Sequence, residues 1–240
     1  MHPNMKFSEI LFSTVLSAPV VLAVSITELD DFNAPSGAPN PQESWLEGGG
    51  SPTQPSQQLT GGPDGSGFLI DSSSGISPGK RMQFWNTDQW TGDYLGQSIS
   101  TLSLDANNLS GPGGETINLR VALNGPGGWF VTEPQVLLPE TGWQPLLFDL
   151  SLTGLVHAGQ GDGVYGSTMS AVNRLQIISL EEDTFNFGGN AGLRGDTIVA
   201  TLGLDNIRAG EAIPEPSSTA LILMGLSLIH ISEPTRPREI

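Results

Sequence analysis

Residues 101–132 contain the clearest alternation of apolar and polar positions along the chain. A period of two is typical of a strand with one buried face, so this region predicts two half-buried strands at 102–107 and 117–124. Asn124-Gly125-Pro126-Gly127-Gly128 supplies turn residues for a hairpin into a third strand at 129–132. The alternating apolar positions are Leu102, Leu104, Ala106, Ile117, Leu119, Val121 and Leu123.

Shorter strand signals flank this region and are separated by turns rich in Gly and Pro. No long segment has the 3.6-residue period of an amphipathic helix, although Ser151 to Ala158 is expected to form a short helical turn. Many short strands with close turns predict an all-β fold, a jelly-roll-like antiparallel β-sandwich. The further expected strands are 27–32, 44–47, 67–71, 82–86, 143–150, 174–180 and 197–208.

The chain is acidic and lacks cysteine. Nine Lys and Arg against 25 Asp and Glu give a net charge of −16. Nucleic acids and anionic lipids need basic patches, so neither is expected as a partner. Without cysteine, disulfides, thiol catalysis and cysteine-ligated metals are excluded.

The N-terminus has the pattern of a secretory signal. Lys6 gives a positive start, the run from Ile10 to Val24 is short and apolar, and Ala23 and Ser25 are small. This pattern predicts a signal peptide over residues 1–25, cleaved after Ser25, and a β-sandwich domain over 26–210.

Pro214, Glu215 and Pro216 follow the last expected strand and stand directly before the apolar run from Thr219 to Leu228. The prolines end any sheet or helix there. This arrangement, at 211–226, resembles the PEP-CTERM sorting signal of exported bacterial proteins. The resemblance implies recognition of these three residues by an exosortase, a membrane helix before processing, and a location at the surface or extracellular matrix of a Gram-negative bacterium.

The apolar run is about half of the ~20 residues that a membrane-spanning helix needs. Beyond it, Glu233, Pro234 and Pro237 would break a helix. Residues 227–240 resemble translated sequencing-adapter read-through, so the native hydrophobic helix is expected to be truncated here. We exclude this tail from the fold.

A second resemblance rests on Trp90-Thr91-Gly92-Asp93-Tyr94-Leu95-Gly96-Gln97 and the strand expected after it. This stretch is similar to laminin B (domain IV) modules, which implies a jelly-roll sheet over roughly residues 30 to 209. The disulfide frame of those modules does not carry over to a chain without cysteine.

Catalytic chemistry has few residues to use. His157 is the one histidine outside the two ends, and no Gly-x-Ser-x-Gly elbow supports a triad around it. A glycoside hydrolase needs two carboxylates at a set separation, and the sequence selects no pair. We therefore expect a non-enzyme. The available glutamates include Glu115, Glu133, Glu140, Glu181 and Glu182.

Two binding sites are conceivable in a sandwich of this kind. Asp30 and Asp31 in the first strand and Asp205 in the last could hold a structural calcium through hard oxygen ligands, or could simply face solvent. Trp90 and Tyr94, in a turn-like segment, could stack on sugar rings, whereas Trp85 and Trp129 in alternating strands favour the core.

Together these patterns predict an exported, non-catalytic β-sandwich presented outside the cell. The alternatives are a carbohydrate-binding module with structural calcium, whose partner is extracellular polysaccharide, and a secreted glycoside hydrolase.

Overall fold

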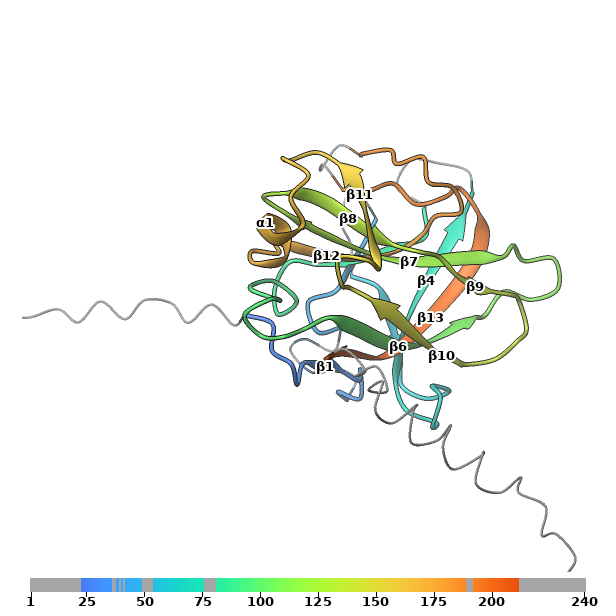
Figure 1. Cartoon of the computed structure of the whole chain (residues 1–240). Coiled ribbons are helices and arrows are strands. Elements are labelled where there is room, and N and C mark those ends of the chain that lie inside the picture. Colours follow the sequence, from blue (N-terminus) through green and yellow to red (C-terminus); the bar gives the residue numbers. More distant parts are fainter. Residues whose placement is uncertain are drawn as a thin grey trace, which may run out of the picture.

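The computed structural model describes residues 23–35, 38, 40, 42–48, 54–75, 81–188 and 192–211. Two antiparallel sheets face each other across an apolar core, which confirms the predicted β-sandwich (Figure 1). No helix in this described part of the chain is long and apolar enough to span a membrane. Residues 1–22, positions 212–226 of the segment expected to be a sorting signal (211–226) and the tail at 227–240 lie outside it.

The first sheet, sheet A, is six-stranded among the described residues. It contains β1 (Leu29–Asp30), β3 (Ser56–Gln58), β4 (Phe68–Ser74), β6 (Thr101–Asn108), β10 (Gln144–Asp149) and β13 (Val199–Gly210). The strand order is β10-β6-β13-β4-β3, and β1 pairs with β13 outside that order. The long strands β6 and β13 pair with each other inside the sheet, and β6 confirms the strand predicted at 102–107.

The second sheet, sheet B, is seven-stranded over the same described residues. Its strands are β2 (Leu46–Glu47), β5 (Gln83–Asn86), β7 (Ile117–Gly125), β8 (Gly128–Thr132), β9 (Gln135–Leu137), β11 (Leu155–Gly159) and β12 (Arg174–Ser179). The order is β11-β8-β7-β12-β5-β2, with β9 on β7. The predicted hairpin joins β7 to β8, and Gly128 has a φ of 99°, which glycine adopts without strain.

The inward positions of both sheets form one main core. Leu102, Leu104 and Ala106 of β6 are buried, and the polar residues between them are partly exposed. The same core takes in Phe32, Trp45, Phe84 and Phe148 from segments that sequence periodicity does not mark as strongly. Burial of such large side chains is the main favourable term in the stability of the fold.

The expected helical turn at 151–158 is wrong in part. Residues 152–154 form a turn, but Leu155–Gly159 is the edge strand β11, which pairs with β8 from Leu155↔Thr132 onward. Local propensity gave no sign of this pairing because the partner strand lies far away in sequence. The short helix α1 (Tyr165–Met169) comes after β11 instead and contacts β7 and β8.

The chain enters and leaves the sandwich at the same end. Strand β1 runs antiparallel to the end of β13, with Leu29 opposite Arg208 and Asp30 opposite Ile207. Ala209 N also donates to Glu28 O at 3.1 Å. The start of β13 at Val199 therefore lies at the opposite end of the sandwich, a strand length of about 36 Å away.

Candidate functional site

The segment after β12 folds back over the outer face of sheet B. We call residues 181–188 and 192–196 the flap. Phe187 and Leu193 form an antiparallel bridge within it. The flap side chains Phe185, Phe187 and Leu193 belong to a second apolar cluster, separate from the main core. Their partners on the sheet are Ala122, Trp129, Val131 and Ile178.

Arg120 fixes the beginning of the flap to sheet B. Its side chain is 2% exposed, and it donates from Nε to Leu180 O at 2.8 Å and from Nη2 to Glu181 O at 3.2 Å. Nη1 donates to Thr132 O, and Nη2 also pairs with Asp183 Oδ1 at 2.8 Å. The guanidinium of Arg120 is buried and makes four hydrogen bonds, three of them to backbone carbonyls. These bonds fix the direction in which the chain leaves β12.

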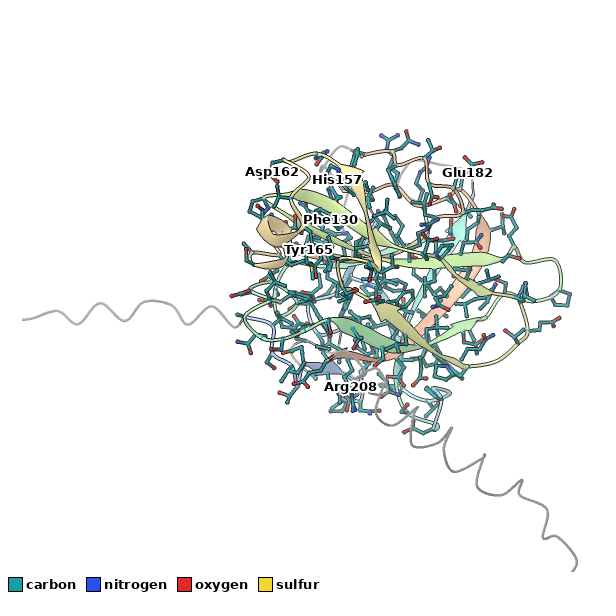
Figure 2. The ribbon with its side chains drawn as sticks, in the orientation of Figure 1. Phe130, His157, Asp162, Tyr165, Glu182 and Arg208 are labelled. Atoms are coloured by element: carbon teal, nitrogen blue, oxygen red, sulfur yellow. The ribbon has the colours of Figure 1, made fainter. Side chains whose placement is uncertain are left out.

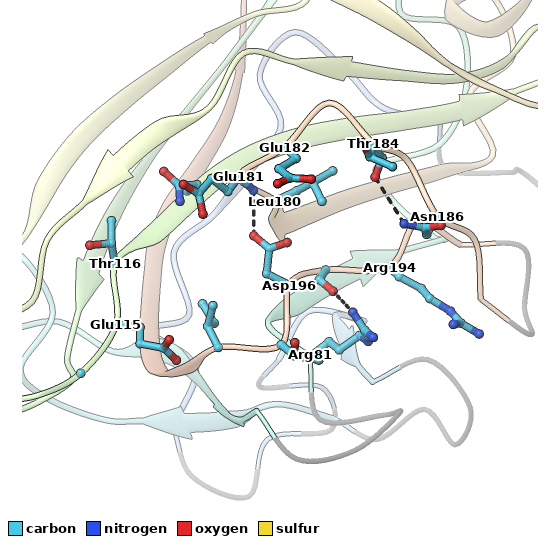
Figure 3. A pocket seen from close by; sticks show the side chains of 15 residues that line it. Arg81, Glu115, Thr116, Leu180, Glu181, Glu182, Thr184, Asn186, Arg194 and Asp196 are labelled. Carbon is cyan, nitrogen blue, oxygen red and sulfur yellow. Dashed lines mark hydrogen bonds between the residues drawn. The ribbon is translucent and has the colours of Figure 1, made fainter.

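The flap builds one wall of a cleft of about 1020 Å³ (Figure 3). The opposite wall comes from the loop before β7 and from the first residues of β7. In Figure 2, Glu182 of the flap lies at the opposite end of the molecule from Arg208 near the end of β13. The charged and amide side chains in the lining are Arg81, Glu115, Asn118, Glu181, Glu182, Asn186, Arg194 and Asp196.

Hydrogen bonds hold the return of the flap against the sheet. Asp196 Oδ2 accepts from Glu181 N at 2.7 Å, and Asp196 N donates to Ser179 O at 2.8 Å. Arg81 Nη1 donates to Gly195 O. Burial raises the pKa of the Asp196 carboxyl above its ordinary value. By contrast, Glu181, Glu182 and Arg194 are exposed, so their charged groups can meet a ligand.

This lining suits a ligand with many hydroxyl groups. Carboxylates accept hydrogen bonds, guanidinium groups donate them, and Thr and Asn side chains such as Thr184 and Asn186 do both. The described lining has no aromatic side chain, so recognition in the cleft depends on hydrogen bonds rather than ring stacking. Arg81 and Arg194 stand against four carboxylates, which disfavours a polyanion.

The predicted sugar-stacking pair Trp90 and Tyr94 is wrong. Both side chains are 0% exposed and belong to the main core. Trp90 Nε1 donates to Asp30 Oδ2 at 2.6 Å, and Tyr94 OH donates to Trp90 O at 3.0 Å. In sequence the segment has the pattern of a surface turn. In the structure the Trp90 indole lies inside the core, where the buried carboxylate of Asp30 in β1 accepts its hydrogen bond.

Two other tryptophans are half-buried on the outer faces of the sheets. On sheet B, Trp85 lies 4.7 Å (ring centroid) from Cζ of Arg174, which covers part of its ring. On sheet A, Trp143 packs edge-on against Phe68 and donates to Gly61 O at 2.8 Å. Trp129, expected in the core, is buried under the flap.

The predicted calcium ligands lie near one another but are already hydrogen-bonded. Asp30 Oδ2 accepts from Trp45, Trp90 and Gln89, and Asp205 Oδ2 accepts from Ser66 Oγ at 2.8 Å. Burial raises the pKa of Asp205 to about 6. Asp31 Oδ1 accepts from Asn33 N. Within the described ranges, no group of three His, Cys, Asp or Glu residues could hold a metal ion.

Calcium therefore stays a prediction. Nearby, Gln42 Oε1 and Glu43 Oε2 are buried without a hydrogen-bond partner, and burial next to Asp30 raises the pKa of Glu43 to about 9. If Asp30, Asp31 and Asp205 hold a calcium ion, its removal by EDTA should lower the melting temperature of the wild type. The same addition should have no such effect on Asp205→Asn. An unfolding curve that EDTA does not shift would remove calcium from the account.

The residues considered for catalysis are only partly brought together. His157 is exposed, its Nε2 is 2.9 Å from Gln160 O, and its ring packs beside Phe130. Of the five named glutamates, Glu115, Glu181 and Glu182 line the cleft, whereas Glu133 and Glu140 do not. No sequence pattern groups these three glutamates, because two separate loops supply them.

Sequence reasoning missed the flap and hence the remaining cleft residues. Between the strands expected at 174–180 and 197–208, no element is predicted from the sequence. One signal was present. Phe185 and Phe187 alternate with Thr184 and Asn186, which is the pattern of a segment lying on an apolar surface.

No protein-family model and no curated protein sequence matches this chain. A solved exo-β-agarase is 13% identical; the match covers 81% of this chain and 26% of that chain, with a TM-score of 0.51. The family 11 carbohydrate-binding module from Clostridium thermocellum is also 13% identical, covering 80% of this chain and 99% of its own, with a TM-score of 0.47. The CBM22-1 xylan-binding domain from Paenibacillus barcinonensis is 14% identical, with coverages of 80% and 98% and a TM-score of 0.42.

The structural match to the agarase supports a shared β-sandwich fold and nothing finer. The chain spans about a quarter of the agarase that it matches. The comparison does not assign a ligand, because folds of this kind carry many unrelated sites.

Proposed function

We propose that this chain is an exported, non-catalytic polysaccharide-binding domain, sorted to the bacterial surface through Pro214, Glu215 and Pro216. The polar cleft beside the flap carries the binding part of this proposal. It is open, of a size to admit several sugar units, and lined by side chains that can donate and accept hydrogen bonds, among them the exposed Glu181, Glu182 and Arg194. The partners would be extracellular polysaccharide and, during export, an exosortase.

The position of the cleft supports presentation away from the membrane. Strand β13 begins beside the cleft at Val199 and ends at Gly210, where the chain continues toward the sorting sequence. If the sequence after Gly210 holds the protein at a membrane before processing, the cleft faces outward. A site at the other end of the sandwich would face the lipid headgroups.

The likeness to part of an exo-β-agarase is compatible with this function. The agarase match shows that the fold occurs within an enzyme that acts on a polysaccharide, as its name states. We infer a binding role for this chain from its own cleft, and we propose agar, xylan and mixed-linkage β-glucan as the polysaccharides to test first.

A secreted glycoside hydrolase is the second candidate, favoured by one observation. Glu115, Glu181 and Glu182 line the same cleft, and burial gives neighbouring Asp196 a raised pKa, as a general acid needs. Release of reducing ends from any of the three polysaccharides by the wild-type protein, but not by Glu182→Gln, would replace binding with hydrolysis.

Affinity electrophoresis in gels containing each polysaccharide tests the binding proposal. The variant Glu182→Gln/Arg194→Gln removes two exposed charged groups from the cleft, and we expect at least a ~10-fold loss of affinity, since charged hydrogen bonds are worth about 1.5–3 kcal/mol each. Glu133→Gln/Arg208→Gln is the matched control, because both residues are exposed and outside the cleft. Equal retardation of the two double variants, or no retardation of wild type, would refute the site.

Mass spectrometry of envelope and medium fractions from the native host tests the sorting proposal. We expect a mature chain ending near Pro214-Glu215-Pro216 and accumulation of an unprocessed form when Glu215 is replaced by Ala. An intact chain in the cytosol would contradict export and sorting together.

A further inference from the structure

The first residues of the described chain belong to the folded domain. Val24 is 1% exposed and lies in the main apolar core. Its backbone N donates to Thr91 O at 2.8 Å. The sequence pattern places this residue inside the signal peptide, two positions before the cleavage expected after Ser25. Cleavage after Ser25 would therefore remove a residue that is part of the folded core.

The site that receives Val24 is itself tied into the core. Thr91 is followed by Gly92, which exchanges two backbone hydrogen bonds of 2.8 Å with Val172 on the far side of the segment. Gly92 has a φ of 126°, and a Cβ there would come within 2.9 Å of Ala23 Cβ. The N-terminal segment at Ala23 and Val24 therefore packs closely against a fixed partner.

Ser25 has a structural part as well. Its carbonyl accepts from Glu28 N at 3.0 Å, and its hydroxyl lies 3.2 Å from Thr27 Oγ1, so it forms the turn that leads into β1. Cleavage after Ser25 would remove this turn together with the buried Val24 side chain. Ala23, by contrast, is exposed, and removing it leaves these bonds in place.

We propose that signal peptidase hydrolyses the Ala23–Val24 peptide bond, an inference that rests on the proposed export. Water adds across the bond, leaving a carboxylate on Ala23 and an α-ammonium on Val24. The new ammonium keeps Thr91 O as its acceptor and gains access to solvent where Ala23 stood. Ala23 supplies the small residue that the peptidase needs immediately before the cut.

The test is N-terminal sequencing and intact mass of the full chain after expression in a Gram-negative host, using the periplasmic fraction. An N-terminus at Val24 is the expected result. A start at Ile26, or at any other residue of a periplasmic form, overturns the cleavage position but leaves export standing. An uncleaved chain confined to the cytosol overturns export and the cleavage position together.

A variant pair tests the structural reason separately. In the exported protein, Val24→Ser should lower the melting temperature by several degrees, because a buried apolar side chain is lost. Val136→Ser, the same substitution at an exposed position of β9, should leave it within about 1 °C. Equal melting temperatures for Val24→Ser and wild type would overturn the argument from the fold even if the cut were found at Val24.

Discussion

The outer faces of the two sheets differ in how far they are covered by other parts of the chain. Along β6 in sheet A, buried and partly exposed residues alternate up to Ala106. In sheet B, every residue of β8 is buried, and so are all residues of β12 except Arg174. The flap accounts for the difference, since it places Phe185, Phe187 and Leu193 on the outer face of sheet B alone.

A covered face changes what each residue type must do. On sheet A a polar side chain can remain hydrated, so alternation is enough to specify the strand. On sheet B the covered polar groups need partners inside the protein. Arg120 finds them in the flap backbone, and Gln176 donates to Gln83 Oε1 and Leu193 O. The flap thereby converts a solvent face into a second core and supplies the wall of the cleft.

Replacing Arg120 should produce the largest contrast between the two faces. Arg120→Met leaves three backbone carbonyls without their charged donor, and we expect a loss of about 3 kcal/mol in the free energy of unfolding. Arg208→Met, on the exposed side of β13, should change it by less than about 0.5 kcal/mol. Urea denaturation measures both, and equal losses would show that the flap does not depend on Arg120.

Removing a flap aromatic should have a smaller effect on stability. Phe187→Ala takes a half-buried ring off the outer face of sheet B, with an expected cost of about 1–2 kcal/mol. It should also speed trypsin cleavage after Arg194, because the flap opens more often. Leu147→Ala, an exposed apolar position of β10 in sheet A, is the control. Unchanged proteolysis in Phe187→Ala would argue that the second apolar cluster does not hold the flap.

The contact between Asp71 of β4 and β5 of the other sheet should make the free energy of unfolding depend on pH. Asp71 of β4 accepts a hydrogen bond from the backbone of Gln83 in β5, and burial beside Glu47 raises its pKa to about 8. A carboxyl whose pKa rises on folding stabilises the fold fully at low pH, and this contribution is lost as the pH rises through about 8.

The expected slope for Asp71 is at most ~1.4 kcal/mol per pH unit in the free energy of unfolding. Asp71→Asn resembles the protonated form, so wild type should lose stability relative to this variant between pH 5 and pH 9. Asp162→Asn, in an exposed loop, controls for the loss of one negative charge. If the difference in free energy of unfolding between wild type and Asp71→Asn does not vary with pH, the pKa of Asp71 is not raised by folding.

Much of the fold could be predicted because its strands alternate or sit between strong turns. The strands around Leu104 and Val121, the hairpin at Gly128 and the last two strands were all expected from the sequence, and the structure confirms them. Strand β11 could not be predicted, because its partner strand lies in a separate hairpin and its own residues alternate weakly.

The functional site was less predictable than the fold. Its lining comes from loops that only tertiary packing brings together, such as the one containing Glu115 and the flap containing Glu182. Trp90 and Tyr94 were placed on the surface because nothing local shows that Asp30 would be buried beneath them. Long-range hydrogen bonds of this kind leave no periodic signal in the sequence.

Backbone-amide NMR titration tests the central claim most directly. The isotope-labelled mature protein would be titrated with an oligosaccharide of whichever of agar, xylan or mixed-linkage β-glucan retards it in gels. We expect the largest chemical-shift changes in the cleft, around Thr116, Glu182, Asn186 and Arg194. Changes centred on Trp143 and the outer face of sheet A, with the cleft unaffected, would contradict it.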